Sequence, residues 1–266
     1  MSETTAKILH NINEMDAELW DSCNAARPYN PFLTHKFLNA LESSGSVSTE
    51  TGWQPFHIVV EQNEVLIGVV PLYIKNHSQG EYVFDYGWAD ALQRAGGDYY
   101  PKMQISVPFT PASGPRLLTR EVNPEHEKLL LGACMQIAEQ IKVSSIHITF
   151  MHQNQWENAA SIGFLKRMDQ QFHWHNGGYT DFDGFLADLA SKKRKNIKRE
   201  RRDALANGIE IEWATGADLT EEHWDAFYKF YLDTSSRKWG SAYLNREFFS
   251  TINAVMADDV LLILAK

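Results

Sequence analysis

The sequence predicts a mixed α/β fold (α+β) built in two parts. Helical and strand-like periodicities alternate along the chain, as in proteins whose sheets are covered by helices. Residues 56–60 and 65–74 are rich in β-branched and apolar side chains, and helix-capping signals separate such runs. A glycine turn at 176–178 is typical of a boundary. We therefore predict domains at 1–178 and 179–266.

Three elements of the first part follow from local signals. Asn30 and Pro31 are expected to begin a helix that continues to about Gly45. The polar link 61–64 between two strand-like runs predicts a hairpin. Asn123 with Pro124 forms an N-cap and first-turn pair, so a helix is expected to start there.

The second part begins with a helical pattern from Phe182 that leads into a strongly basic helix. The alternation at 209–213 predicts a strand, and Thr220 is expected to cap a following helix. A further helix is predicted at 246–257. The run 260–265 is unbroken and apolar, which favours a strand buried on both faces at the centre of a sheet. Pairing of this run with the 209–213 strand is the alternative.

Composition limits the classes of function. The chain has 266 residues, a net charge of −9 and two cysteines, so it shows neither a disulfide framework nor a generally basic surface. The first residues do not show a basic region followed by an apolar one, and no apolar run is long enough to cross a membrane. These features predict a cytoplasmic protein without a membrane span. They also argue against DNA binding, because no helix-turn-helix spacing is present.

Common catalytic motifs are absent from the sequence. It has no nucleophile elbow, no Walker-type phosphate loop and no dinucleotide turn. Residues 93–98 come close to a loop that cradles the pyrophosphate of acyl-CoA, but Asp98 would repel phosphate, so we interpret them as a plain glycine turn. His173 and His175 would point to opposite faces of a strand, and no metal site is predicted.

The segment 84–118 combines aromatic rings, acids, several prolines and the cations Lys102 and Arg116. Such rigid, aromatic-rich loops suit a cleft that binds a sugar, a peptide or an amino acid. The alternative is a proline-stiffened loop that covers the core and carries surface charges. On the first interpretation, carboxylates could accept an amine proton and the cations could hold a carboxylate or phosphate. The catalytic candidates are Asp85 and Asp90, and the substrate-binding candidates are Trp88, Tyr99, Tyr100, Lys102 and Arg116.

Residues 191–203 carry eight lysines and arginines against two acids. So many like charges on one helix repel each other, and an anionic partner would relieve that repulsion. We expect phosphate binding, on a nucleotide, a CoA or a tRNA backbone. The alternative is a solvated helix whose charges are balanced by ion pairs within the protein. The phosphate-binding candidates are Arg194, Lys195, Lys198 and Arg199.

These segments together resemble the FemAB-like group of the GNAT acyltransferase superfamily. The resemblance covers almost the whole chain, and its most specific parts are the 84–118 segment and the basic helix. The remaining matching stretches are Asn30–Glu42, Gln171–Trp174 and Lys238–Asn245, which includes Trp239.

The resemblance implies tandem GNAT-like domains, each a mixed sheet flanked by helices, and transfer of an acyl or aminoacyl group to an amine acceptor. Related proteins attach amino acids to peptidoglycan precursors and take them from aminoacyl-tRNA. We therefore expect a peptidoglycan-precursor substrate, acyl-CoA or aminoacyl-tRNA as co-substrate, and no tightly bound cofactor. A non-catalytic module that binds a cell-wall precursor or an anionic ligand is the alternative. Family chains continue past 260–265, so we expect an incomplete second domain and an inactive 266-residue form.

Overall fold

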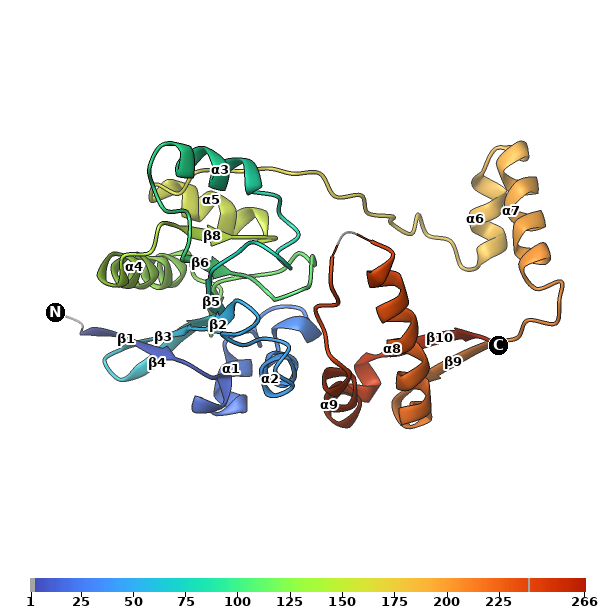
Figure 1. Cartoon of the computed structure of the whole chain (residues 1–266), viewed down its shortest axis with the longest axis horizontal. Helices are drawn as coiled ribbons and strands as arrows, with labels where there is room; N and C mark the ends of the chain where they lie inside the picture. The colour runs from blue at the N-terminus through green and yellow to red at the C-terminus, as the bar shows by residue number, and fades with distance from the viewer. Residues whose placement is uncertain (1–2, 239) are drawn as a thin grey trace.

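The computed structural model describes residues 3–238 and 240–266 of the chain, so Trp239, part of the resemblance above, lies outside the described residues. The fold is mixed α/β, as the sequence predicted. Two four-stranded sheets form the N-terminal part, and a two-stranded ribbon lies in the C-terminal part. Figure 1 shows helices around these sheets and an extended segment leading to α6 (Phe182–Asp188) and α7 (Ser191–Ala204).

The first sheet has the order β1-β3-β4-β7, and all of its strand pairs are antiparallel. Helix α4 covers one face, and α1 and α2 cover the other. Asn63 and Glu64, both with positive φ, turn the chain between β3 and β4, which confirms the predicted hairpin. The bounds are Thr4–Leu9 for β1, His57–Gln62 for β3, Val65–Val70 for β4, Leu118–Thr119 for β7, Ala17–Ser22 for α1, His35–Ser43 for α2 and Pro124–Ile141 for α4.

The second sheet has the order β2-β5-β6-β8, with β6 and β8 parallel and the other pairs antiparallel. The two sheets are joined through Phe56 and Pro71, the single residues between β2 and β3 and between β4 and β5. The Phe56 amide donates to the Leu72 carbonyl at 2.9 Å, and this hydrogen bond holds the two connecting segments together where the chain passes from one sheet to the other. Its strands and neighbouring helices are Trp53–Pro55 (β2), Leu72–Lys75 (β5), Lys102–Ile105 (β6), Ile146–Ile148 (β8), Tyr86–Arg94 (α3) and Gln153–Ser161 (α5).

The C-terminal elements pack on the N-terminal part through α9 (Arg246–Met256), which lies against α2. The Phe248 ring meets the Phe37 ring edge to face at 6.1 Å, and the Asn245 amide donates to the Ser46 hydroxyl at 3.2 Å. Thr220 caps α8 (Glu221–Ser236) as predicted. One hydrophobic cluster therefore includes side chains from both predicted domains. The boundary at 178/179 stays a prediction.

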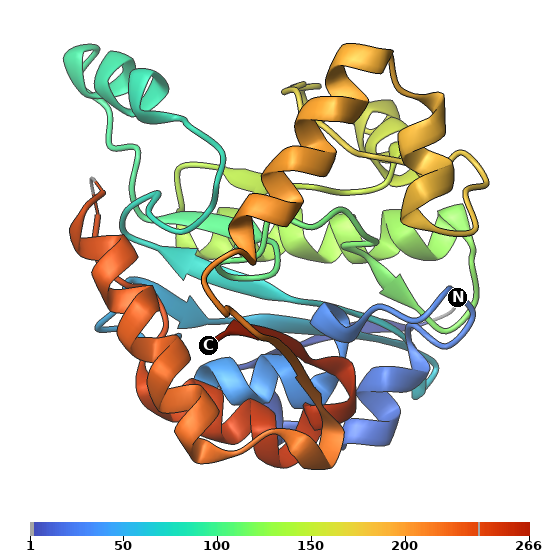
Figure 2. The ribbon, with the colours of Figure 1, turned by 90° about the vertical axis from the view of Figure 1, so that its right-hand side faces the viewer.

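The C-terminal strand differs from the expectation. β10 (Leu261–Ala265) pairs with β9 (Ile211–Thr215) in a two-stranded ribbon, which is the alternative pairing considered above. Leu262 is buried, whereas Leu261 and Ile263 on the other face are 52% and 54% exposed. The prediction of burial on both faces was wrong, because α8 and α9 cover only one face of the ribbon in the described part of the chain. Figure 2 shows the ribbon lying over these helices.

Local signals failed at two further places. The predicted helix from Asn30 is split at Thr34: a single 3-10 turn comes first, and α2 begins at His35 with the Thr34 hydroxyl as its cap. The predicted strand around His173 and His175 does not form, and the two rings stack at 6.2 Å instead of facing apart. At 93–98, Gly96 with a φ of 83° ends α3, which confirms the plain glycine turn.

Candidate functional site

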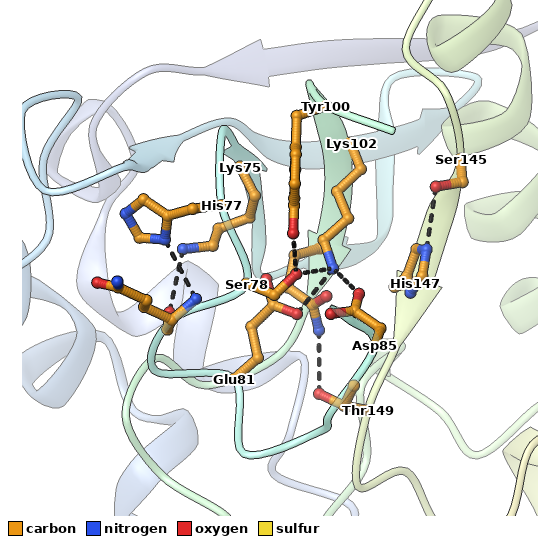
Figure 3. A network of polar contacts seen from close by, with 12 residues as sticks. Lys75, His77, Ser78, Glu81, Asp85, Tyr100, Lys102, Ser145, His147 and Thr149 are labelled. Carbon is orange, nitrogen blue, oxygen red and sulfur yellow. Dashed lines mark hydrogen bonds and ion pairs between the residues drawn. The ribbon is translucent and has the colours of Figure 1, made fainter. Parts of the chain in front are cut away.

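The second sheet has one apolar face and one polar face, and both are buried. Met103 and Ile105 point toward α4 in a hydrophobic cluster. Lys102, Gln104, Tyr73 and Lys75 occupy the alternate positions of β5 and β6, and each is fully buried. Because alternation usually indicates a solvent-facing side, the sequence alone would place these polar groups in water. In the structure the loop 76–85 lies over Lys75 and Lys102 (Figure 3), and Tyr73 packs against the rings of Trp53 and His57.

Lys102 lies at the centre of a hydrogen-bonded network on this polar face (Figure 3). Its Nζ donates to Asp85 Oδ2 at 2.6 Å, to Glu81 Oε2 at 2.8 Å and to Ser78 Oγ at 3.0 Å. Asp85 Oδ2 also accepts from the Tyr99 hydroxyl at 2.7 Å. All three Nζ protons are therefore used, and the cation is paired with two carboxyl groups from one loop.

Both carboxylates of the network keep an oxygen with no hydrogen-bond partner. These atoms are Glu81 Oε1 and Asp85 Oδ1. Ten buried side-chain nitrogens and oxygens lack a partner in the described part of the chain, and five of them lie on or over the polar face. The other three are Tyr73 Oη, Gln104 Oε1 and Ser106 Oγ. Since buried polar atoms are normally paired, this concentration marks a place where a donor-bearing group would be stabilised.

Glu81 and Asp85 share Lys102, but their pKa values move in opposite directions. Burial raises the pKa of Glu81 above its ordinary value, and Lys102 only partly opposes this. Burial also acts to raise the pKa of Asp85, but hydrogen bonds from groups that include Lys102 and Tyr99 outweigh it and hold the pKa below its ordinary value. Asp85 is therefore the partner whose ionised form is favoured, and Glu81 is the carboxyl group whose protonated form is favoured relative to an ordinary glutamate.

Two bases complete the polar face, the half-buried His147 and the fully buried Lys75. Burial lowers the pKa of His147 to about 4, so its ring is neutral at pH 7. Its Nε2 lies 3.0 Å from Ser145 Oγ and 3.5 Å from the Tyr99 hydroxyl oxygen. Burial also lowers the pKa of Lys75 to about 7. The face thus holds several titratable groups whose pKa values are shifted by burial, and Lys75 is the one whose pKa is brought near physiological pH.

The structure brings together some of the residues predicted from sequence and separates others. Lys102, Tyr99 and Asp85 are partners in the network, and Tyr100 reaches it through Ser78 Oγ at 2.7 Å. Asp90 and Trp88 instead lie on α3, a helix with no buried residue. Asp90 pairs there with Arg94 at 2.8 Å, and Trp88 is 55% exposed beneath the Arg167 guanidinium.

Arg116 is buried away from any carboxylate in the described part of the chain. Its guanidinium donates to the backbone carbonyls of Thr149, Pro115 and Ala112 at 2.9, 3.1 and 2.6 Å. These bonds fix the segment between β6 and β7 against the end of β8. Burial lowers the pKa of Arg116 to about 10. Its role in substrate binding stays a prediction.

Glu81 and Lys75 were not among the sequence candidates. A signal for them was present, because Leu72–Lys75 and residues 102–106 both alternate apolar and polar residues. The missing information was that the polar side of both strands is buried, which depends on the fold of the loop 76–85. Lys75 also lies directly opposite Lys102 in the β5–β6 register, a pairing that no local pattern reveals.

The basic helix α7 lies apart from the polar face, at the end of the extended segment (Figure 1). It has no buried residue. Lys198 pairs with Asp183 of α6 at 3.3 Å, and the Arg201 guanidinium lies 3.9 Å from the centroid of the Phe182 ring. Lys195 and Arg199 are exposed and have no hydrogen bond or ion pair in the described part of the chain. Among the four phosphate-binding candidates, these two side chains are the most available to an anion, since Arg194 is half-buried and donates to the Leu189 carbonyl at 3.2 Å.

Replacement of Lys195 and Arg199 by Gln is expected to weaken binding of a single-stranded RNA probe without loss of stability. Each neutralised contact should lower the slope of log affinity against log salt by about 0.7. Melting temperature should stay level or rise, since the i,i+4 repulsion is removed. Fluorescence anisotropy at several salt concentrations measures this, with Lys7→Gln and Lys128→Gln as a distant double control. An unchanged salt slope would show that α7 is only a solvated helix.

The chain matches the FemAB-like family, described as peptidoglycan biosynthesis/recognition, over residues 11–266. It belongs to that family. The function therefore lies in the biosynthesis or recognition of peptidoglycan, consistent with an aminoacyl transferase. No curated protein and no solved structure matches the chain. In the described residues, no helix is long and apolar enough to cross a membrane. No cluster of three or more His, Cys, Asp or Glu side chains there could hold a metal.

Proposed function

We propose that this FemAB-like protein transfers an acyl or aminoacyl group to an amine of a peptidoglycan precursor, at the polar face of β5, β6 and β8. One observation carries the proposal: Glu81 and Asp85 share one lysine, but burial raises the pKa of Glu81 while hydrogen bonds hold that of Asp85 low. Neighbouring carboxyl groups separated in this way are typical of acid–base chemistry. Each of the two carboxyl groups also keeps one oxygen without a hydrogen-bond partner, and these oxygens could accept hydrogen bonds from an ammonium group.

The reaction requires removal of protons from the acceptor. An ammonium nitrogen cannot attack a carbonyl, so the ionised Glu81 first takes one of its protons. The nitrogen then bonds to the acyl carbon, and the bond from that carbon to the leaving oxygen or sulfur breaks. The leaving group takes the second proton as the amide forms. Asp85 remains ionised and, through Lys102 and Tyr99, holds the polar face in place.

The network is closed in this structure, since Lys102, Glu81 and Asp85 are at most 4% exposed. Ser78, Glu81 and Asp85 all lie on the loop 76–85, which leads directly into α3. Because α3 buries none of its residues, the loop is held to the rest of the protein by its own contacts, which include the three hydrogen bonds from Lys102 and the bond from the Phe109 amide to the Gly80 carbonyl. The acceptor amine enters when this loop moves outward. The acyl donor is acyl-CoA or aminoacyl-tRNA, with its phosphates on α7.

A recognition module without catalysis is the second candidate, and the closed network favours it. A buried Lys102 with two carboxylates would also serve to fix the loop 76–85, with no substrate ever reaching Glu81. On this account the protein binds a cell-wall precursor or an anionic ligand through its surface. The family description covers recognition as well as biosynthesis.

The test is a transfer assay read by mass spectrometry. The 266-residue chain, and a form that includes any residues following Lys266, are incubated with acyl-CoA or aminoacyl-tRNA and an amine-bearing precursor fragment. The proposal expects a product heavier by one acyl group. Product from the longer form alone fits the sequence-based prediction that the 266-residue form is inactive. If neither form gives product with any donor but the fragment binds, recognition is the function.

A further inference from the structure

An aromatic pocket lies where the extended segment joins α6, apart from the polar face (Figure 1). Its volume is about 360 Å³, and it opens to solvent. Three rings surround that of Phe185, with their centroids at 6.0 Å for Trp174, 5.7 Å for Tyr179 and 5.5 Å for Phe182. Trp174 and Phe182 are 67% and 40% exposed, so the cluster is assembled but not covered. Such a patch at an open surface is typical of a binding site.

Hydrogen bonds within the chain hold the walls of this pocket. The Asn176 side chain accepts from the Tyr179 amide at 2.8 Å and donates to the Tyr179 carbonyl at 3.2 Å. The Tyr179 hydroxyl donates to Asp188 Oδ2 at 2.5 Å. Asp181 caps α6 by accepting from the Gly184 amide at 2.7 Å. The rings are therefore placed by the turn and the helix cap, without help from a ligand.

A cation of the basic helix α7 borders the pocket. The Arg201 guanidinium lies 3.9 Å from the centroid of the Phe182 ring, which lines the pocket. Arg194, Lys198 and Arg201 share one face of α7 by their spacing. Lys198 is in an ion pair with α6, and Arg194 donates to a backbone carbonyl. Among the residues that the structure describes, Arg201 forms no hydrogen bond or ion pair, so its donors can bind an anion.

The charges around the pocket limit what it can hold. Asp181 is one of the lining residues, and its carboxylate repels a phosphate placed among the rings. The anionic part of a ligand therefore belongs beside Arg201, and the part among the rings is flat and uncharged. A nucleobase joined to a phosphate has this distribution. Aromatic rings that stack on bases, next to a row of cations that follows the phosphates, are the usual means of binding single-stranded nucleic acid.

We propose that the aromatic pocket holds an unpaired nucleobase of the acyl donor, stacked among its rings, while Arg201 binds the neighbouring phosphate. Lys195 and Arg199, exposed on a neighbouring face of α7, extend the phosphate contacts along the helix. Both candidate donors, acyl-CoA and aminoacyl-tRNA, contain a base joined to phosphate, so the same chemistry fits either one. The inference rests on the proposed function, because it gives the nucleotide of the donor its place.

Fluorescence anisotropy with two labelled probes tests the pocket without any activity. One probe is a single-stranded tetraribonucleotide, and the other has the same length and charge but lacks all bases. Trp174→Ala should weaken binding of the first probe by about 5- to 150-fold, as for the loss of one stacking platform, and leave the second unchanged. Trp174→Phe keeps a ring and should retain most of the affinity. The control Phe172→Ala removes an exposed ring of the same segment outside the pocket and should change neither probe.

Arg201→Gln separates the phosphate contact from stacking. It should lower the slope of log affinity against log salt by about 0.7 for both probes. Trp174→Ala should leave that slope unchanged. Both side chains are exposed, so the melting temperatures of the variants should equal that of the wild type. Equal affinity of the wild type for the two probes, or an equal loss in Trp174→Ala and Phe172→Ala, would overturn the inference.

Coenzyme A distinguishes the two sources of the nucleotide. If it displaces the RNA probe, and Trp174→Ala weakens this competition, the pocket binds the base of acyl-CoA. If it competes no better than inorganic pyrophosphate while the RNA probe still depends on Trp174, the pocket binds a base of RNA. Each of these results supports the base site and assigns the donor.

The pocket and the proposed function can fail separately. If binding depends on Trp174 but no donor yields product, the proposed function fails and the nucleotide site stands. If product forms and Trp174→Ala leaves the KM for the donor unchanged, the inference about the pocket fails and the transfer reaction stands.

Discussion

Replacement of Lys102 by Met is expected to lower the free energy of unfolding by about 3–5 kcal/mol. The side chain is fully buried, and its Nζ lies 2.6 and 2.8 Å from Asp85 and Glu81 carboxylate oxygens. Without it, two buried carboxylates face each other with no cation, which is the costly way to break a buried ion pair. Urea unfolding at pH 7 measures the loss.

Matched variants separate this effect from the loss of an ordinary ion pair. Arg94→Met removes the exposed pair with Asp90 on α3 and should change stability by less than about 1 kcal/mol. Adding Glu81→Gln and Asp85→Asn to Lys102→Met should recover part of the loss, because no uncompensated charge remains. If Lys102→Met is no more destabilising than Arg94→Met, the network does not hold the loop 76–85 in place.

Glu81→Gln is expected to lower the rate of acyl transfer by about 100- to 10,000-fold, the range typical of a lost general base. The amide keeps the size of the side chain and can still accept from Lys102, but it cannot take a proton. Single-turnover rates at saturating donor and acceptor give the comparison, and urea unfolding shows whether the variant folds.

Asp90→Asn is the control for Glu81→Gln, since Asp90 was an equal candidate from sequence but lies exposed on α3. Its transfer rate should stay within about twofold of the wild type, as expected for a surface change outside the reacting groups. The account would be wrong if Asp90→Asn abolished transfer while Glu81→Gln left it intact. The catalytic base would then lie on α3.

The sequence predicted those elements whose signals are local. The hairpin at Asn63 and Glu64 and the helix caps at Asn123 and Thr220 depend on residues within one turn of each other, and each was confirmed. Mixed α/β architecture follows from alternating periodicities, and the resemblance to the FemAB-like family was confirmed by the match over most of the chain.

What the sequence did not reveal depends on contacts between distant segments. Every side chain of the run 260–265 is apolar. Whether one face or both faces of the strand are buried depends on where α8 and α9 lie. Likewise, Lys75 and Glu81 look like ordinary polar residues at a strand end and in a loop. Their chemistry arises from the β5–β6 register and from the loop that buries both of them. Periodicity indicates which residues share a face, but not whether water reaches that face.

The most direct test of the central claim is to map where an amine-bearing peptidoglycan-precursor fragment binds. Methyl and amide chemical shifts of the protein are followed by NMR as the fragment is added, in the wild type and in Glu81→Gln. The account predicts that the largest changes fall on Tyr73, Glu81, Gln104 and Ser106, around the unpaired atoms of the polar face. Changes confined to α7 or to the exposed face of α3, with the polar face unaffected, would contradict it.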